Sequence, residues 1–306
     1  MRPVAMNLAG VAEFPALGST PYRIDVDGRP YVPVGDGGIV LGVELGDRVT
    51  AAVGDHVAPG VSLGHPDPAA RFALTAYACV GNPVLVRVGA AAGATGYVIG
   101  KRGEDGRVLA WLPQEALERL KPGDGVSVRA SGQGARLDGG PDAVEVLNVD
   151  PALLAGLGVE VGLAGLGVEV GLDGVGVGVR AVVPSRLAGN GVGRPAQLWD
   201  LDLAFPAGDP VLESLRLGDL LAVADLDVRH NMGFRRGWTT VGLVVHGDSP
   251  MPGHGPGFAP LLTGPGTLLQ PLADAEGHRG LTLDVLGHRA AGGSRLPAAG
   301  AGGRAG

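Results

Sequence analysis

The stretch that decides the fold reads Thr240-Val241-Gly242-Leu243-Val244-Val245-His246 and continues as Gly247-Asp248-Ser249-Pro250-Met251-Pro252-Gly253-His254-Gly255-Pro256-Gly257. Its first part is a run of mainly apolar and β-branched residues, which is typical of a buried strand. Its second part consists largely of Gly and Pro, which hold a loop in one shape and let a ligand approach the main chain. The stretch predicts a strand that delivers a rigid loop, with one imidazole ending the strand and another inside the loop.

The first half of the chain shows the same alternation of short strands and turns. Tyr22-Arg23-Ile24-Asp25-Val26 ends at Asp27-Gly28, a hairpin signal, and Pro30-Tyr31-Val32-Pro33-Val34 follows. Helices are few, and the better candidates are Asp67 to Ala78 and Pro113 to Leu120. This spacing predicts a mainly β protein, a β-rich α+β fold with two β-barrel-like or curled-sheet halves.

A length of 306 residues indicates more than one domain. We expect a β-rich domain over 1–150, a linker or hairpin over 151–180, a second β-rich domain over 181–275 and an Ala/Gly-rich, partly disordered tail over 276–306. The linker contains a repeat, because Leu154 to Gly162 recurs unchanged as Leu163 to Gly171, and a degraded copy follows to Arg180.

Composition limits the partners and the compartment. The formal charge of −7 supplies no basic patch for phosphate backbones, so we expect no nucleic-acid partner. Cys79 is the only cysteine, which precludes an intramolecular disulfide. No run approaches the roughly 20 apolar residues that span a bilayer, and the N-terminus lacks the apolar core of a secretory signal. We therefore expect a cytoplasmic protein without a membrane partner.

Two Gly/Pro-framed loops carry the candidate catalytic residues, which are Asp55, His56 and His254. The pair Asp55-His56 supplies either a metal ligand with its neighbour or a carboxylate that orients an imidazole for base catalysis. The alternative is structural: Asp55 caps a turn and His56 bonds the backbone. His246, at the end of its strand, is either a further ligand or a core histidine.

Weaker sequence patterns suggest further candidates for metal ligands and substrate-binding residues. Asp225 and Asp227, with His230, form an Asp-x-Asp-x-x-His motif that suits a divalent ion, although these residues are also common in turns. Arg235 and Arg236 are candidates for pairing with a substrate carboxylate, or are solvated charges. The remaining substrate-binding candidates are Asn82 and Gln133, and Cys79 is interpreted as a buried thiol.

Several of these segments together resemble a known family. Gly54-Asp55-His56-Val57, Ala78-Cys79-Val80-Gly81-Asn82, Gly218-Asp219-Leu220-Leu221-Ala222 and Gly253-His254-Gly255-Pro256-Gly257 occur in the same order in DUF4438, an uncharacterised bacterial and archaeal family. The resemblance spans Tyr22 to Gly264 and implies a two-part β-rich fold, with a distant kinship to acetamidase/formamidase-type amidohydrolases. The nine-residue repeats and the tail depart from it, as does Arg102, where the resemblance implies a His.

Common cofactor motifs are missing from the sequence. It contains no Walker loop, Cys-x-x-Cys pair, His-Glu-x-x-His helix or Gly-x-Ser-x-Gly elbow, and we expect no nucleotide cofactor. The leading hypothesis is a small-molecule enzyme, a metal-assisted hydrolase or lyase that acts on an amide or imide carbonyl in a cleft between the halves, with a divalent ion such as zinc. The alternatives are a non-catalytic protein that binds a small ligand and a scaffold that assembles through its repeats. Homo-oligomerisation stays open.

Overall fold

The computed structural model describes residues 3–15, 17–18, 20–103, 106–162, 174–273 and 280–292. The first part of the chain contains β1 (Met6–Ala12), β2 (Arg23–Ile24), β3 (Pro30–Tyr31), β4 (Ile39–Val40), β5 (Gly60–Gly64), α1 (Pro68–Tyr77), β6 (Pro83–Val86), β7 (Thr95–Arg102), β8 (Arg107–Trp111), α2 (Gln114–Leu117) and β9 (Gly125–Ala130). The rest contains β10 (Glu145–Val146), η1 (Pro151–Leu153), β11 (Val159–Val161), β12 (Val175–Val179), β13 (Ala181–Pro184), η2 (Ser185–Leu187), β14 (Leu201–Asp202), α3 (Pro210–Ser214), β15 (Leu220–Asp227), β16 (Gly233–His246), β17 (Gly257–Pro265), β18 (Leu269–Ala273) and α4 (Leu283–Gly292).

The strands of the first part close into a barrel. They follow the order β1-β9-β6-β7-β8-β5, and antiparallel pairing of β1 with β5 joins the two ends. Alternating side chains of these strands fill the interior, where Leu63, Val98 and Val128 are fully buried. The helix α1 begins at its cap Asp67, whose carboxylate accepts the Ala70 N–H at 2.8 Å, and it packs beside β1 and β8. Closure leaves few exposed strand edges in this half.

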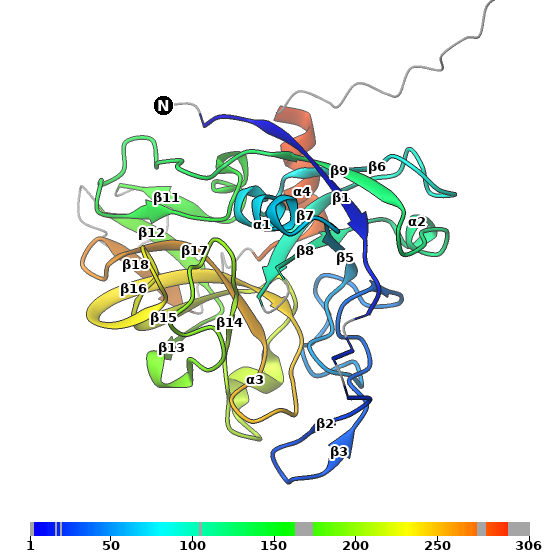
Figure 1. Ribbon diagram of the computed structural model, residues 1–306. Helices are drawn as coiled ribbons and strands as arrows, with labels where there is room; N and C mark the ends of the chain where they lie inside the picture. The colour runs from blue at the N-terminus through cyan, green and yellow to red at the C-terminus, as the bar shows by residue number, and fades with distance from the viewer. Residues whose placement is uncertain are drawn as a thin grey trace, which may run out of the picture.

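The second sheet lies beside the barrel, and its strands follow the order β10-β17-β16-β15-β13 (Figure 1). Its centre is the antiparallel run β15-β16-β17, and β14 pairs with β17. The register of β16 against β17 shifts between Val244 and His246. Such a bulge re-aims the side chain that follows it, so the local irregularity decides where the imidazole at the end of β16 points.

The repeat region contributes to a small third sheet. The first copy supplies β11 and the third copy supplies β12, and these two strands pair antiparallel, with β18 parallel on the other side of β12. Residues 163–173, which include the second copy, lie outside the described residues. Within the predicted tail, α4 follows Leu281, and the buried side chain of Leu286 joins the central core.

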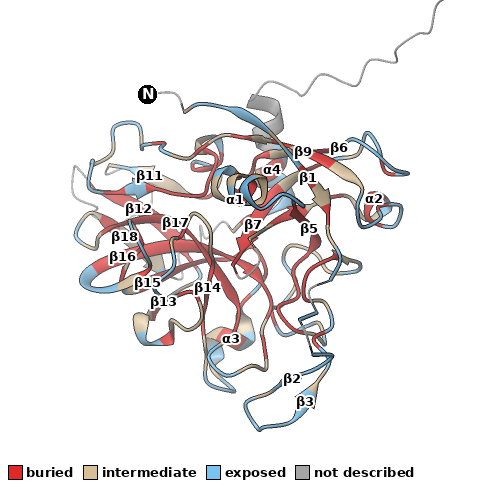
Figure 2. Ribbon diagram, viewed as in Figure 1, coloured by how far each residue is buried: buried red, intermediate tan, exposed pale blue. Residues whose placement is uncertain are grey.

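The two large sheets share one core. Ile99 and Leu109 of the barrel lie in the same buried cluster as Val241, Leu243 and Leu261 of the second sheet. Figure 2 shows this interior as buried strands, whereas the β2–β3 hairpin is exposed. Among the described helices, none combines the length and the apolar character needed to cross a bilayer.

The predicted fold class is confirmed: the protein is mainly β, with a barrel in its first half and few short helices. The two expected helices are present, at Pro68–Tyr77 and Gln114–Leu117. The second is shorter than the predicted span because Glu118 and Arg119 form a turn, in which the Arg119 N–H donates to the Ala116 carbonyl three residues back.

Candidate metal centre

The two Gly/Pro-framed loops are bonded to each other through their backbones. The His56 N–H donates to the Asp248 carbonyl at 3.1 Å, and the Gly247 N–H donates to the Val57 carbonyl at 2.8 Å. His56 itself has φ of 54°, a left-handed conformation that is uncommon outside glycine. This strained backbone persists because both loops hold it, and strain of this kind clusters at functional sites.

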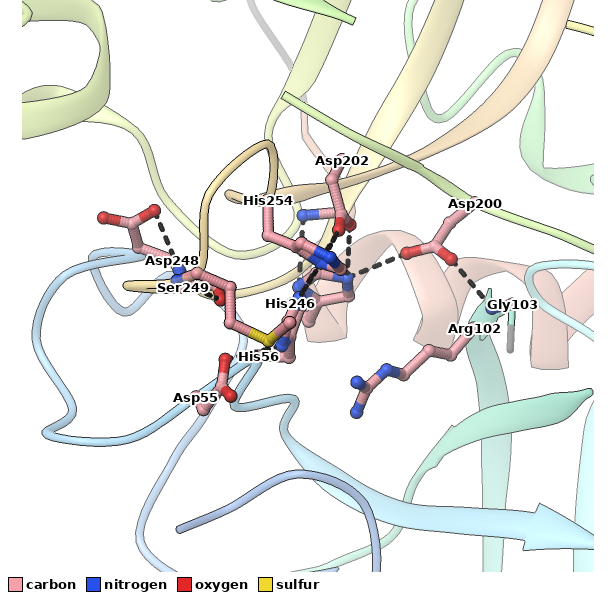
Figure 3. Close-up of polar contacts among 12 residues, drawn as sticks. Asp55, His56, Arg102, Gly103, Asp200, Asp202, His246, Asp248, Ser249 and His254 are labelled. Atoms are coloured by element: carbon pink, nitrogen blue, oxygen red, sulfur yellow. Dashed lines mark hydrogen bonds and ion pairs between the residues drawn. The ribbon is translucent and has the colours of Figure 1, made fainter. Parts of the chain in front are cut away.

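Two further elements complete the cluster. His246 ends β16 after the bulge, and His254 follows in the loop, where its N–H donates to the Met251 carbonyl at 3.1 Å. Asp200 and Asp202 flank Leu201 at β14, and β14 is held in place by pairing with the start of β17. Figure 3 shows that the side chains of these residues face one another at the junction of the barrel and the second sheet.

Three ligand atoms converge on one point. His254 Nδ1 lies 2.7 Å from Asp202 Oδ2 and 3.0 Å from His56 Nε2, and His56 Nε2 lies 3.4 Å from Asp202 Oδ2. Ligands of a tetrahedral zinc ion, with bonds of about 2.0–2.2 Å, lie roughly 3.3 Å from each other. The three atoms therefore have the chemistry and nearly the spacing of a divalent-metal site, and they form one of the His/carboxylate groups that could hold an ion.

Asp55 orients His56 from behind. Its Oδ1 lies 2.6 Å from His56 Nδ1, while its Oδ2 accepts bonds from Arg23 at 2.7 Å and from the Tyr31 hydroxyl at 2.8 Å. Burial would raise the pKa of the Asp55 carboxyl, but the adjacent imidazole outweighs burial and holds that pKa well below its usual range. A carboxylate beside Nδ1 stabilises a proton on that nitrogen and leaves Nε2 facing His254 and Asp202.

The electrostatics of the cluster favour positive charge. Burial would lower the pKa of the His246 imidazole, but Asp200 and Asp202 raise that pKa to about 10. Burial would likewise lower the pKa of the His56 imidazole, but its contacts with Asp202 and Asp55 raise that pKa. The three imidazoles in turn depress the pKa of the Asp202 carboxyl, although its burial acts in the other direction. The buried carboxylates therefore stay ionised and attract protons or a cation.

Access to the cluster is uneven. The side chain of His254 is 13% exposed, whereas those of His56 and Asp202 are 2% and 4% exposed. Solvent and ligands therefore reach the three converging atoms from the side of His254.

Comparison with known proteins identifies the family. The N-terminal domain of unknown function DUF4438 matches residues 22–155, and the C-terminal domain DUF4438_C matches residues 166–278. The chain belongs to the DUF4438 family. The crystal structure of TM1086 is similar, at 32% sequence identity and a TM-score of 0.81, and the match covers 89% of this chain and 93% of that one. The search of curated proteins found no match.

In this DUF4438 protein, Asp225 and Asp227 do not join the histidines, contrary to the predicted metal set. Asp227 pairs with Gly233 at the far end of β16 from His246, and a strand of 14 residues spans roughly 45 Å. Asp225 accepts the Gly237 N–H at 2.7 Å, and Asp227 forms an ion pair with Arg229 at 2.8 Å. Both carboxylates have structural partners in this turn.

The predicted substrate-binding arginines lie at the same turn. Arg235 contacts Asp227 at 3.2 Å and stacks on the Trp238 ring at 4.2 Å, and Arg236 is exposed. His230 is also part of this turn and is exposed. The structure thus separates the whole Asp-x-Asp-x-x-His segment and its arginines from the cluster of His56, His246 and His254.

Gln133 belongs to a second buried polar network around Lys101, whereas the Asn82 amide bonds the backbone of Cys79 and Ser131. The Lys101 ammonium donates to Asn148 Oδ1 and to the Gln197 carbonyl, both at 2.8 Å, and to the Ala76 carbonyl at 3.2 Å. Gln133 donates to the same Asn148 oxygen at 2.9 Å, and Asn82 donates to the Ser131 carbonyl at 2.8 Å.

Cys79 lies beside this network. Burial raises the pKa of its thiol to about 11, so the thiol stays protonated near neutral pH. The side chain is fully buried, as the sequence interpretation expected, and it carries no thiolate chemistry under ordinary conditions.

Sequence reasoning missed Asp36, Asp200, Asp202, Arg23, Tyr31 and Arg102 as members of the cluster. Arg102 is buried and contacts Asp36, which also pairs with Arg23. A signal existed for the aspartates in Trp199-Asp200-Leu201-Asp202-Leu203, because an alternating pattern places both carboxylates on one side of a strand. Nothing local indicates that this side faces the histidines.

Proposed function

We propose that this protein is a metal-dependent hydrolase or lyase that acts on a small carbonyl compound. The observation that carries the proposal is the convergence of His56 Nε2, His254 Nδ1 and Asp202 Oδ2 within 3.4 Å of one another. Two imidazoles and one carboxylate are the ligand set of several catalytic zinc sites, in which the fourth position is left for water or substrate. The exposure of His254 supports an open position on that side.

Each residue of the cluster has a separate task in this proposal. His56, His254 and Asp202 hold the ion, and Asp55 fixes the orientation of the His56 ring through the 2.6 Å contact. When bound, the ion supplies Lewis-acid polarisation of a carbonyl and lowers the pKa of water. His246 and Asp200 keep the Asp202 carboxylate in place from the opposite side, where His246 Nε2 lies 3.4 Å from Asp202 Oδ1.

The substrate class is the finer part of the proposal. An amide or imide follows from the kinship with acetamidase/formamidase-type amidohydrolases that the family resemblance implies. A linear amide would be hydrolysed to an acid and an amine, and a cyclic imide would be opened by the same addition of water. Both reactions need a polarised carbonyl and a water molecule activated at neutral pH, which a metal site of this composition supplies.

Metal analysis of the purified full-length protein tests the proposal. We expect bound transition metal in the wild type and its loss in His56→Ala and in His254→Ala, measured by mass spectrometry after dialysis. His230→Ala is the matched control, because His230 lies at the distant β15–β16 turn and should leave the metal content unchanged. Hydrolysis of a panel of linear amides and cyclic imides should require the metal and fail in the first two variants.

Two results would contradict this function. A wild-type protein that retains no metal after loading with zinc or manganese would remove the proposed centre. A protein that retains the metal, binds a small carbonyl compound from the panel and never converts it would instead support the non-catalytic binding alternative.

A further inference from the structure

A second group of ligand atoms lies directly beside the first. His246 Nε2 is 2.8 Å from Asp200 Oδ2 and 3.4 Å from Asp202 Oδ1, and these three residues also form a His/carboxylate group that could hold an ion. All three residues are buried. The ring centroids of His246 and His56 lie only 4.9 Å apart, so the two groups are neighbours within one cluster.

Asp202 belongs to both groups and offers a different oxygen to each. Its Oδ2 faces His56 and His254, whereas its Oδ1 faces His246. A carboxylate that divides its oxygens in this way is suited to bridge two ions, and dinuclear enzyme sites hold their ions about 3.5–4 Å apart. Figure 3 shows Asp202 between the imidazoles, with Asp200 on the side of His246.

The orientation of His246 favours a cation at Nε2. Its Nδ1 lies 2.9 Å from the Gly247 carbonyl oxygen and accepts a bond from the Gly257 N–H at 3.2 Å, so main-chain contacts hold the ring with Nε2 toward the carboxylates. Nε2 therefore faces the oxygens of Asp200 and Asp202. A positive charge between these buried atoms, either a proton on the ring or a bound cation, is stabilised by the two carboxylates.

Space for this arrangement depends on Gly257. A Cβ atom at Gly257 would lie 2.2 Å from His246 Nε2 and 2.7 Å from Asp200 Oδ2. Only a residue without a side chain fits beside this pair. The lack of a side chain at Gly257, the first residue of β17, therefore leaves room for His246 and Asp200 to lie side by side.

The carboxylates of Asp200 and Asp202 differ in their ion-pair partners from the nearby carboxylates of Asp36 and Asp55. Asp36 and Asp55 are paired with arginines, since Arg23 contacts both and Arg102 contacts Asp36. Within the described part of the chain, the ion pairs of Asp200 and Asp202 involve imidazoles instead. Buried carboxylates are costly without a positively charged partner, and at this position an imidazolium or a bound cation meets that need.

We propose that His246, Asp200 and Asp202 form a second divalent-cation site, and that Asp202 bridges two ions in one dinuclear centre. The inference rests on the proposed function, because it takes the site of His56, His254 and Asp202 as the first of the two. The second site is the more enclosed, since the side chain of His246 is 1% exposed. It holds and polarises the bridging carboxylate, while the first site faces solvent through His254.

The test counts ions in the full-length protein after removal of metal with a chelator and titration with Zn²⁺. We expect about two ions per chain in the wild type and about one in Asp200→Asn and in His246→Gln. Asp248→Asn is the matched control, because Asp248 lies in the same loop region but belongs to neither ligand group, and it should keep both ions. His254→Ala should lose the ion of the first site.

Electron paramagnetic resonance of the Mn²⁺-loaded protein gives a second readout, and its first part, the spectrum of the wild type, needs no variant. Two ions bridged by Asp202 should show an exchange-coupled spectrum, and Asp200→Asn should restore the six-line signal of an isolated ion. One ion per chain with an uncoupled signal, unchanged in Asp200→Asn, would overturn the second site and leave the first intact. Binding of no ion at all would overturn the proposed function as well.

Discussion

Two buried polar clusters join the barrel to the second sheet, and they differ in how their polar atoms are paired. Around Lys101, every contact described above joins a donor to an acceptor, including the three bonds of the ammonium. Around His56, by contrast, two imidazole nitrogens and one carboxylate oxygen converge on a single point, 2.7–3.4 Å from one another. A network in which every donor has an acceptor stabilises the fold, whereas one that brings several ligand atoms to a single point is suited to hold a cation.

Replacing Asp202 should have the largest effect on metal binding by the cluster of His56, His254 and Asp202. Asp202→Ala removes the oxygen ligand that faces His56 and His254, and loss of a residue behind a metal ligand alone costs 10–100-fold in affinity. We expect zinc affinity to fall by at least about 1,000-fold, measured by competition with a chelator. A fall smaller than tenfold would mean that the two imidazoles do not bind metal together with this carboxylate.

Replacing Lys101 should lower the stability of the fold and leave metal binding unchanged. Lys101→Ala leaves the Asn148 oxygen and two buried carbonyls without their donor, and unsatisfied buried groups are costly. We expect the free energy of unfolding to fall by about 3 kcal/mol, measured by urea denaturation, with unchanged zinc affinity of the folded protein. Altered zinc affinity would show that the two clusters are not separate.

Asp55 tests whether the ring orientation of His56 matters. Asp55→Asn keeps the size of the side chain but removes the charge that lies 2.6 Å from His56 Nδ1. We expect a 10–100-fold loss of zinc affinity without loss of either direct imidazole ligand. If folded Asp55→Asn binds zinc as tightly as the wild type, Asp55 pairs with Arg23 and does not orient the His56 ring for metal binding.

The pH dependence of stability should report on Lys101. Burial lowers the pKa of its ammonium to about 8 from 10.5, so the folded state releases the proton first as the pH rises. Between these values the unfolded chain binds more protons than the folded one, and stability relative to Lys101→Met should increase with pH by up to about 1.4 kcal/mol per unit. Below pH 8 both states are protonated and the difference should be constant. Parallel pH curves for the two proteins across pH 8 to 10.5 would contradict this prediction.

The smallest effect is expected at the distant turn. Asp227 pairs with Arg229 and Arg235, and partly exposed ion pairs contribute little to stability. Asp227→Asn should change the free energy of unfolding by less than about 1 kcal/mol and leave the metal content as in the wild type. Loss of metal in this variant would return Asp227 to the ligand set.

The comparison also shows what the sequence could predict. The imidazoles of His56 and His254 were found because Gly and Pro frame them in loops that a core does not need. Asp202 was missed because its role depends on the pairing of β14 with β17, a contact between segments more than fifty residues apart. Asn82 and Gln133 were predicted as binding residues, but the Gln133 amide donates within the closed network around Lys101, and the Asn82 amide donates to the distant Ser131 backbone.

A crystal structure of the zinc-loaded protein, with anomalous data collected at the zinc edge, tests the central claim most directly. We predict an anomalous peak about 2.0–2.2 Å from His56 Nε2, His254 Nδ1 and Asp202 Oδ2. Convergence of these atoms without a peak between them, in crystals that hold zinc elsewhere or not at all, would contradict the account.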